Sequence, residues 1–347
     1  MPILRLIAIT VAATVLAACG SGSDDSGFVE PAPSSPLYEA AKKDGKVVVY
    51  ETVTPDVVDA LKKGFEARYP GVEVEAVRLP DAEMIPRLET ELGSNAPTAD
   101  VVQNGSPEWL AAQAKEGAWA AADQSPQATG DGDFDAETYV DEQNHLYELG
   151  ASVTTFAWNT DLVPDGLKDY TDLLDPKLSD GKVGVIELAS GPGNEFYTWL
   201  EKTFDESTYT GLGAQKPRIY PSTTGIIEAL SSGEIYAANW TVPSLVEQAK
   251  EAGAPIDYAM SPTGTFGLRG YAVVNAKAAH PHAAQLYLDF LLSKEGQQLL
   301  WPTASSVVTP APEGVLTTND QLAPRDADAS SAAKVEAART RWDGIYR

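Results

Sequence analysis

The sequence predicts an α/β protein built from two similar halves, each with a largely parallel sheet flanked by helices. One observation is that residues 46–115 alternate apolar runs of strand length with helical patterns, in the order βαβαβ. A second is that residues 171–260 show a similar alternation. A third is the length of 347 residues, 43% of them hydrophobic, which is enough for two well-buried cores.

The first half has recognisable helix start signals. Thr54 and Ser106 are candidate N-caps, and a proline follows each of them. Pro86 interrupts one helical pattern, because proline lacks the N–H that a helix interior needs. The predicted strands span 46–50, 72–77 and 100–103, and the predicted helices span 36–44, 55–69, 81–92 and 107–115.

The second half follows a strand predicted over 146–158. A strand over 265–275 then returns to the first half, and an amphipathic helix over 281–292 and a weaker one over 330–342 follow it. Within the second half, predicted strands span 183–188, 218–220, 235–240 and 255–260, and helical patterns cover 171–174, the stretch ending at Phe204, the stretch ending at Leu230 and the stretch before Lys250.

The stretch from Ser231 to Lys250 predicts a turn, a buried strand and a helix that Thr241 or Ser244 caps. Asn239 and Trp240 then lie at the carboxyl end of a strand, which is where open α/β sheets bind ligands. The alternative is that Trp240 is a core aromatic residue. Replacement of Trp240 by alanine distinguishes the two interpretations.

Charge and motifs exclude several classes of protein. The formal net charge of −25 argues against a nucleic-acid partner and against a basic membrane-binding patch. The sequence contains no G-x-S-x-G, no H-E-x-x-H and no phosphate loop with its lysine, so we expect no enzyme and no cofactor. Glu51 and Glu195 could form a carboxylate pair, but we expect both to be surface acids.

The N-terminus predicts export. Residues 6–15 form an apolar core, and Leu16-Ala17-Ala18-Cys19 resembles the lipobox of bacterial lipoproteins, which implies lipidation of Cys19. Residues 20–35 then form a flexible tether. The protein would be anchored by lipid on the outer face of the bacterial cytoplasmic membrane. The alternatives are an ordinary signal peptide with a chance cysteine and a transmembrane anchor.

Four stretches together resemble the extracellular solute-binding proteins of bacterial ABC importers. They are KVVVYETVTPDVVDALKKGFEARYPGVEVEAV, ADVVQNGSPEWLAAQAKEGAW, FAWNTDLVPDGLKDYTDLLDPKLSDGKVGV and HPHAAQLYLDFLLSKEGQQLL. The resemblance covers residues 46–300. The most similar subgroup is the iron(III)-type receptors and their relatives for phosphonates, sugar phosphates, thiamine and polyamines.

The resemblance implies the type II periplasmic-binding fold, in which strands cross between two lobes and a hinge closes them on a ligand. Residues 36–157 and 271–347 would form lobe one, and residues 158–270 would form lobe two. The crossings would lie near 155–160 and 265–271. The expected partners are a small polar ligand, anionic in our interpretation, and the permease and ATPase subunits. The protein itself would be a monomer.

The candidate ligand-binding residues lie at strand-to-helix junctions, where free backbone N–H groups favour anions. Arg269 could bind a phosphate or carboxylate through two hydrogen bonds. Each hydroxyl could instead be a plain helix cap. The candidates are Thr52, Thr54, Asn104, Ser106, Ser190, Gly191, Asn194, Ser222, Thr223, Thr224, Asn239, Trp240, Thr241, Arg269 and Tyr271.

Iron(III)-type receptors use adjacent tyrosines at the positions that Trp240 and Thr241 occupy here, and neither of these is a hard anionic ligand. We therefore expect no metal site, and we expect His280 and His282 to be surface residues. An iron(III) receptor of the same fold stays open as an alternative, as do a surface-anchored hydrolase and an adhesion protein. Phosphonates, sugar phosphates, polyamines, thiamine-like cations and chelated iron stay open as ligands.

Overall fold

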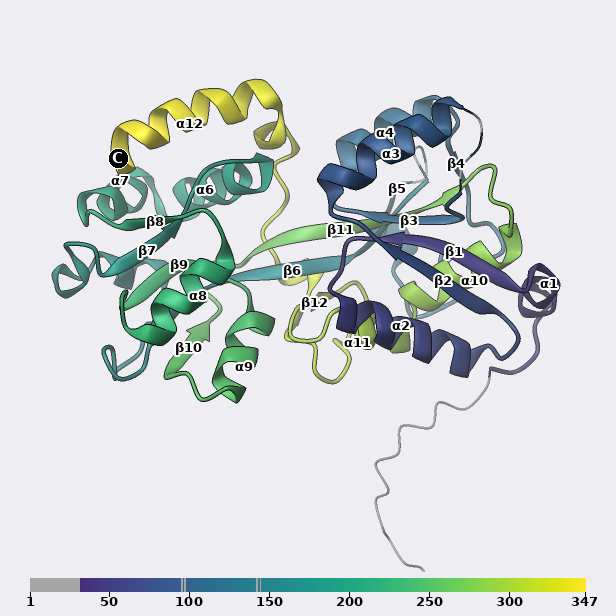
Figure 1. Cartoon of the computed structure of the whole chain (residues 1–347), viewed down its shortest axis with the longest axis horizontal. Helices are drawn as coiled ribbons and strands as arrows, with labels where there is room; N and C mark the ends of the chain where they lie inside the picture. The colour runs from purple at the N-terminus through teal and green to yellow at the C-terminus, as the bar shows by residue number, and fades with distance from the viewer. Residues whose placement is uncertain (1–31, 95, 97, 142, 144) are drawn as a thin grey trace, which may run out of the picture.

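The computed structural model describes residues 32–347, except 95, 97, 142 and 144. The predicted signal peptide, Cys19 and most of the predicted tether lie outside the described residues. The described chain forms two α/β lobes side by side, which the long strands β6 (Leu146–Asn159) and β11 (Phe266–Asn275) connect (Figure 1).

Lobe one is a sheet in the order β2-β1-β3-β11-β6, with parallel pairing among β2, β1 and β3. Two buried clusters cover its two faces, one under α1, α2 and α10 and the other under α3 and α4. Its elements are α1 (Pro36–Asp44), β1 (Lys46–Glu51), α2 (Pro55–Arg68), β2 (Glu73–Arg78), α3 (Asp81–Gly93), β3 (Val101–Asn104), α4 (Pro107–Lys115), β4 (Trp119–Ala120), α5 (Ala136–Tyr139), β5 (Val140–Asp141), α10 (Pro281–Leu292) and α11 (Lys294–Leu300).

Lobe two continues the sheet from β6 through β9, β7 and β8, and β10 pairs with β6 as well. Its core is one aromatic-rich cluster that includes Phe156, Tyr170, Phe196 and Trp199. Its elements are η1 (Tyr170–Leu174), η2 (Pro176–Leu178), β7 (Val183–Ile186), α6 (Gly191–Phe204), α7 (Glu206–Ala214), β8 (Arg218–Tyr220), α8 (Thr223–Ser232), β9 (Ala237–Thr241), α9 (Pro243–Glu251) and β10 (Ile256–Ala259).

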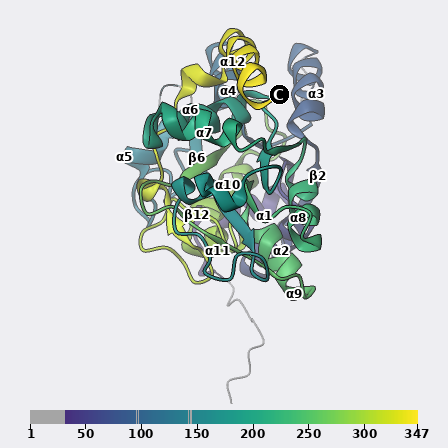
Figure 2. The same cartoon turned by 90° about the vertical axis from the view of Figure 1, so that its left-hand side faces the viewer.

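The C-terminal part of the chain crosses between the lobes once more. It contains β12 (Ser305–Ser306), β13 (Thr317–Thr318), η3 (Asn319–Gln321), η4 (Ala327–Ser330) and α12 (Ala332–Tyr346). β12 pairs with β6, whereas α12 packs on α6 and α7 of lobe two, as Figure 2 shows from that side. Trp342 and Tyr346 are buried in the core of lobe two. The prediction that residues 271–347 all belong to lobe one is therefore wrong for this last helix.

Several local predictions also need correction. The helices α7 and α11 were not predicted, and the predicted turn residues Ser231 and Ser232 are instead the last turn of α8, which ends at Gly233 with φ of 75°. Helix α9 begins after Val242, so neither Thr241 nor Ser244 is its N-cap. Pro86 lies inside α3 without ending it, since α3 continues to Gly93.

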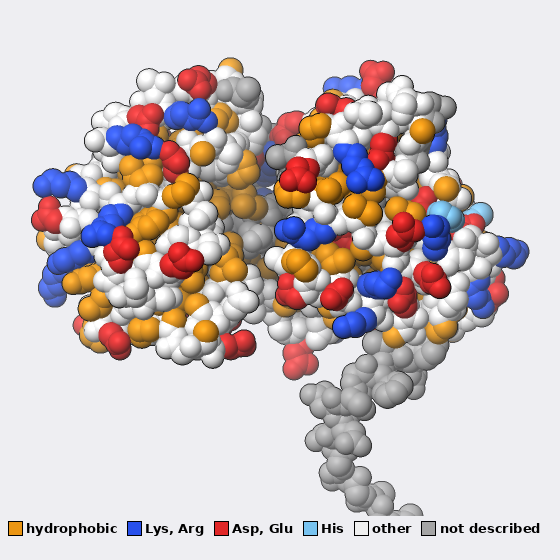
Figure 3. All heavy atoms as spheres, in the orientation of Figure 1, with side chains coloured by type: hydrophobic (Ala, Val, Ile, Leu, Met, Phe, Trp, Pro, Cys, Tyr) orange, Lys and Arg blue, Asp and Glu red, His pale blue; other side chains and the backbone are white. Residues whose placement is uncertain are grey.

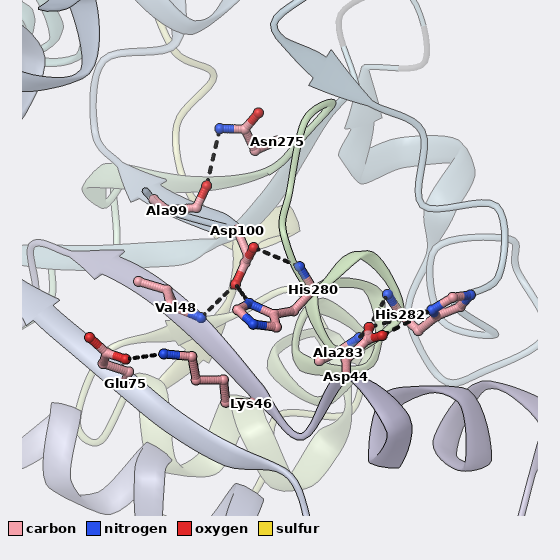
Figure 4. Close-up of polar contacts among 10 residues, drawn as sticks. All are labelled: Asp44, Lys46, Val48, Glu75, Ala99, Asp100, Asn275, His280, His282 and Ala283. Atoms are coloured by element: carbon pink, nitrogen blue, oxygen red, sulfur yellow. Dashed lines mark hydrogen bonds and ion pairs between the residues drawn. The ribbon is translucent and has the colours of Figure 1, made fainter. Parts of the chain in front are cut away.

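His280 and His282 lie at the start of α10 and both contact aspartates (Figure 4). The His280 side chain is largely buried, against the prediction, whereas the His282 side chain is 39% exposed, at the surface as predicted. The buried carboxylate of Asp100 accepts hydrogen bonds from the backbone N–H of His280 at 3.1 Å and of Val48 at 2.8 Å, and lies 2.8 Å from the His280 ring nitrogen Nδ1. Asp44 accepts the backbone N–H of His282 at 2.8 Å. These contacts join α1, β1 and β3 to α10 at the outer end of lobe one, away from the strand ends that face lobe two.

Candidate ligand-binding site between the lobes

The carboxyl ends of strands from both lobes point toward the junction between them. On lobe one, β3 ends with Asn104 beside Tyr271, which in turn lies beside Glu148 of β6. On lobe two, β9 ends with Thr241 beside Thr155 of β6. Positions 148 and 155 are seven residues apart, which corresponds to roughly 23 Å along an extended strand. Figure 3 shows the molecular surface hollowed between the two lobes at this level.

The lobe-one candidates lie at the carboxyl end of β3 and in the loops that follow β1 and β3. Thr52 is half-buried and Thr54 exposed, in the loop between β1 and α2. Asn104 is buried, and its Oδ1 accepts the backbone N–H of Ser106 at 2.7 Å. The hydroxyls of Thr54 and Ser106 make no capping hydrogen bond to their helices, so the expectation of plain capping does not account for either.

On lobe two, the β8–α8 junction contributes exposed hydroxyls. Ser222 caps α8 by accepting the backbone N–H of Gly225 at 3.2 Å, as the alternative of helix capping predicted. Thr224 is exposed, and the Thr223 hydroxyl accepts a hydrogen bond from the Trp240 indole at 3.0 Å. Ser222 and Thr224 are therefore positioned to face solvent at this end of the strands.

The start of α6 is partly covered by the chain itself. The Asn194 side chain is buried and donates to the carbonyl of Ala329 at 2.7 Å. Gly191 lies against Ser330, since a Cβ placed on Gly191 would approach the Ser330 hydroxyl to 3.2 Å. Ser190 is exposed. The predicted role of Asn194 as a ligand contact is thus corrected to a tie between α6 and the C-terminal segment.

The three candidates on β9 are buried. The Asn239 amide oxygen accepts the backbone N–H of Ile186 at 3.2 Å, and the Thr241 hydroxyl lies 2.9 Å from that of Thr155. Trp240 is only 6% exposed and packs edge-on against Phe196, with 4.9 Å between ring centroids. The structure therefore favours the interpretation of Trp240 as a core residue.

Arg269 is committed to an internal ion pair. Its Nε donates to the Glu148 carboxylate at 2.9 Å, and its Nη1 donates to the Ala323 carbonyl at 3.2 Å. Both side chains are largely buried. Burial raises the pKa of Glu148, and the charge of Arg269 opposes that rise. The predicted role of Arg269 as the anion-binding residue is corrected to a structural one.

Tyr271 does line a cavity at the junction, of about 400 Å³, which is large enough for a small solute. The polar lining of this cavity includes Glu108 at the start of α4, Glu148 and Arg325. Arg325 comes from the C-terminal segment, so elements far apart in the sequence meet here. The other lining residues are Pro107, Ala111, Thr138, Tyr139, Val140, Asp141 and Leu146.

Arg78 was not among the sequence candidates, and neither were Glu195 and the cavity-lining residues Glu108, Glu148 and Arg325. Arg78, at the end of β2, is exposed, and its Nε donates to the carbonyl of Val53 in the β1–α2 loop at 2.7 Å. Its position at a strand carboxyl end could have identified it. Glu51 and Glu195 were predicted to be surface acids, and both are buried, on different lobes. Only the tertiary packing places them inside.

The family is apparent from comparison with known proteins. Residues 60–329 match the model of the bacterial extracellular solute-binding proteins. The chain belongs to this family. Structural neighbours of the chain are two-lobe periplasmic binding proteins, which have the arrangement described above.

Three solved structures resemble this solute-binding protein at low sequence identity. The substrate-binding protein of an ABC transporter from Agrobacterium tumefaciens has a TM-score of 0.69 and 19% identity, covering 88% of this chain and 97% of its own. Iron-bound HitA from Pseudomonas aeruginosa has a TM-score of 0.65 and 20% identity, and the match covers 86% of this chain and 99% of HitA. AfuA from Actinobacillus pleuropneumoniae, with fructose-6-phosphate bound, has a TM-score of 0.62 and 20% identity, and the match covers 87% of this chain and 98% of AfuA. These likenesses concern the fold.

Two further observations on this solute-binding protein are confined to residues 32–347, less the four omitted positions. No helix in that part is long and apolar enough to cross a membrane. Within the same residues, no group of three or more His, Cys, Asp or Glu side chains is arranged to hold a metal ion. His280 and His282 pair with aspartates in lobe one instead.

Proposed function

We propose that this protein is the receptor of an ABC importer, which captures a small polar solute between its lobes and delivers it to a membrane permease. The observation that carries the proposal is the opposition of strand ends from two lobes across β6 and β11, with hydroxyl-bearing junctions on both sides. Two strands that connect otherwise separate lobes suit a hinge that closes on a ligand. We infer a monomer that binds without catalysis.

An anionic group on the solute is supported by Arg78 rather than by Arg269. The guanidinium of Arg78 is exposed beside the β1–α2 loop, and among the described residues it forms no ion pair. Arginine can bind a phosphate or carboxylate through two parallel hydrogen bonds. Arg78→Gln should therefore weaken the binding of an anionic solute, whereas Arg68→Gln, on the same lobe but paired with Glu295, serves as its control.

Native mass spectrometry of the purified protein should identify the solute that it carries, and scattering then tests the closure. We expect the radius of gyration to decrease when this solute is added to the emptied protein, because closure brings the lobes together. Tight binding without compaction would contradict a hinge-closing receptor. Conversion of the solute into a product would favour the alternative of a hydrolase.

We further propose that Cys19 carries the lipid anchor. The support is the tetrapeptide Leu16-Ala17-Ala18-Cys19 after an apolar segment, together with the polar stretch that follows it. Stable anchoring needs more than one acyl chain. Cys19→Ala should move the protein from the membrane fraction to the soluble one, and intact-mass measurement of the parent should show the added lipid. A parent protein without lipid would contradict this proposal.

A further inference from the structure

The C-terminal segment 319–331 crosses between the lobes and is attached to both. On the lobe-one side, Asn319 donates to Glu148 at 2.5 Å, and the buried side chain of Leu322 packs with Ala151 and Val153 of β6. On the lobe-two side, Ser330 donates to the Glu195 carboxylate, next to the Asn194 contact described above. The segment therefore joins the hinge strands to the start of α6.

Arg325 lies in the middle of this segment and contacts an acid on each lobe. Its Nη2 is 2.6 Å from the carboxylate of Glu108 on α4 and 3.0 Å from that of Glu195 on α6. The Arg325 side chain is 18% exposed and that of Glu195 is 8% exposed, whereas that of Glu108 is 48% exposed. The contact with Glu195 is thus the sheltered one, and the contact with Glu108 is open to water.

We infer that Arg325 is an ionic latch that sets the separation of the two lobes. Rotation about β6 and β11 that moves α4 away from α6 has to break the contact between Arg325 and Glu108, because the segment stays attached to α6. A water-exposed ion pair contributes little to the free energy of unfolding, so its loss should not unfold the protein. Without the contact between Arg325 and Glu108, the segment no longer holds α4 near α6, and the separation of the lobes should increase. The latch rests on the hinge motion proposed above, but it can be tested without any ligand.

The test measures the distance between spin labels on α4 and α12 in the full chain. Ala112 and Ala337 are exposed, and each is changed to cysteine in a chain that carries Cys19→Ser, so that only these two positions are labelled. Glu108→Gln and Arg325→Gln should each shift the distance distribution to longer values and broaden it. High salt should produce the same shift in the parent, because salt screens the exposed pair.

Arg341→Gln is the matched control. Arg341 likewise contacts two acids, Glu201 at 2.7 Å and Glu206 at 3.1 Å, but both belong to lobe two. Its replacement should leave the distance distribution unchanged. Distributions for Glu108→Gln and Arg325→Gln that superimpose on the parent's would overturn the latch, and so would an equal shift in Arg341→Gln. Since Glu108 is half exposed, its variant should fold even if the Arg325 variant does not. A failed latch would leave ligand-induced compaction as an independent test of the receptor function.

Discussion

Trp240→Ala should lower the free energy of unfolding by about 3–5 kcal/mol, the usual cost of removing a core tryptophan. Trp240 is almost fully buried against Phe196 and Phe266, and its indole N–H donates to Thr223. A cavity in this aromatic cluster cannot be filled by small side-chain movements, because the neighbouring rings are themselves closely packed. Chemical denaturation followed by circular dichroism measures the loss.

Two further variants separate packing from hydrogen bonding at this position. Thr223→Val keeps the side-chain shape but removes the acceptor of the indole N–H, and should cost about 1 kcal/mol. Leu162→Ala, on an exposed leucine of the same lobe, should change stability by less than about 0.5 kcal/mol. If Trp240→Ala kept the parent's stability and lost the solute instead, Trp240 would be a ligand-contacting residue and the core interpretation would be wrong.

Glu51→Gln should stabilise the protein at pH 8 and remove a fall in stability that the parent shows as the pH rises. The Glu51 side chain is fully buried at the end of β1. Among the residues that the structure describes, Oε1 has no hydrogen-bond partner, and Oε2 lies 3.4 Å from the Gln103 amide nitrogen. Burial raises the pKa of Glu51 from 4.5 to about 8. The nearby hydroxyl of Tyr287 is also buried, has no hydrogen-bond partner within the described part of the chain, and offers no positive charge.

The sign of this effect follows from proton binding. Between pH 4.5 and about 8 the folded protein keeps a proton on Glu51 that the unfolded chain has released, so stability decreases as the pH rises. One pKa unit corresponds to about 1.4 kcal/mol, which makes the full decrease roughly 5 kcal/mol. Glutamine cannot ionise, so the variant should exceed the parent by several kcal/mol at pH 8 and equal it near pH 4.5.

Denaturation curves recorded from pH 4.5 to 8.5 measure this difference. Glu83→Gln, on the exposed surface of α3, is the control and should follow the parent at every pH. Parent and Glu51→Gln curves that stay parallel across this range would show that Glu51 is ionised in the folded protein, with a partner or a water that supports its charge.

Much of the fold follows from local sequence signals. The strands at 46–50 and 218–220 and the helices at 36–44 and 107–115 were predicted to within a residue, because apolar periodicity, caps and prolines act over a few neighbouring positions. Helix α7 was missed because two glycines, Gly211 and Gly213, weaken its pattern, although Leu174 and Ile345 pack closely against them.

The sequence predicted less of the candidate site than of the fold. Which residues lie at strand ends could be derived from their order, and Ser222, Thr224 and Tyr271 do lie at the junction. Whether a polar side chain faces solvent or a partner depends on segments distant in sequence. Arg269 is bound by Glu148, which lies 121 positions earlier, and Asn194 by Ala329, 135 positions later. No local pattern encodes such pairings.

The sequence by itself determined the α/β class, the two halves and the family resemblance, because each rests on short-range periodicity or on contiguous motifs. Only the tertiary structure decided where the last helix packs, that Trp240 is buried, and that Arg325 contacts both lobes. It also decided that Glu51 is enclosed with no charged partner among the described residues. Those features depend on which surfaces remain after distant segments have packed, and burial, unlike helix or strand formation, is a property of the whole fold.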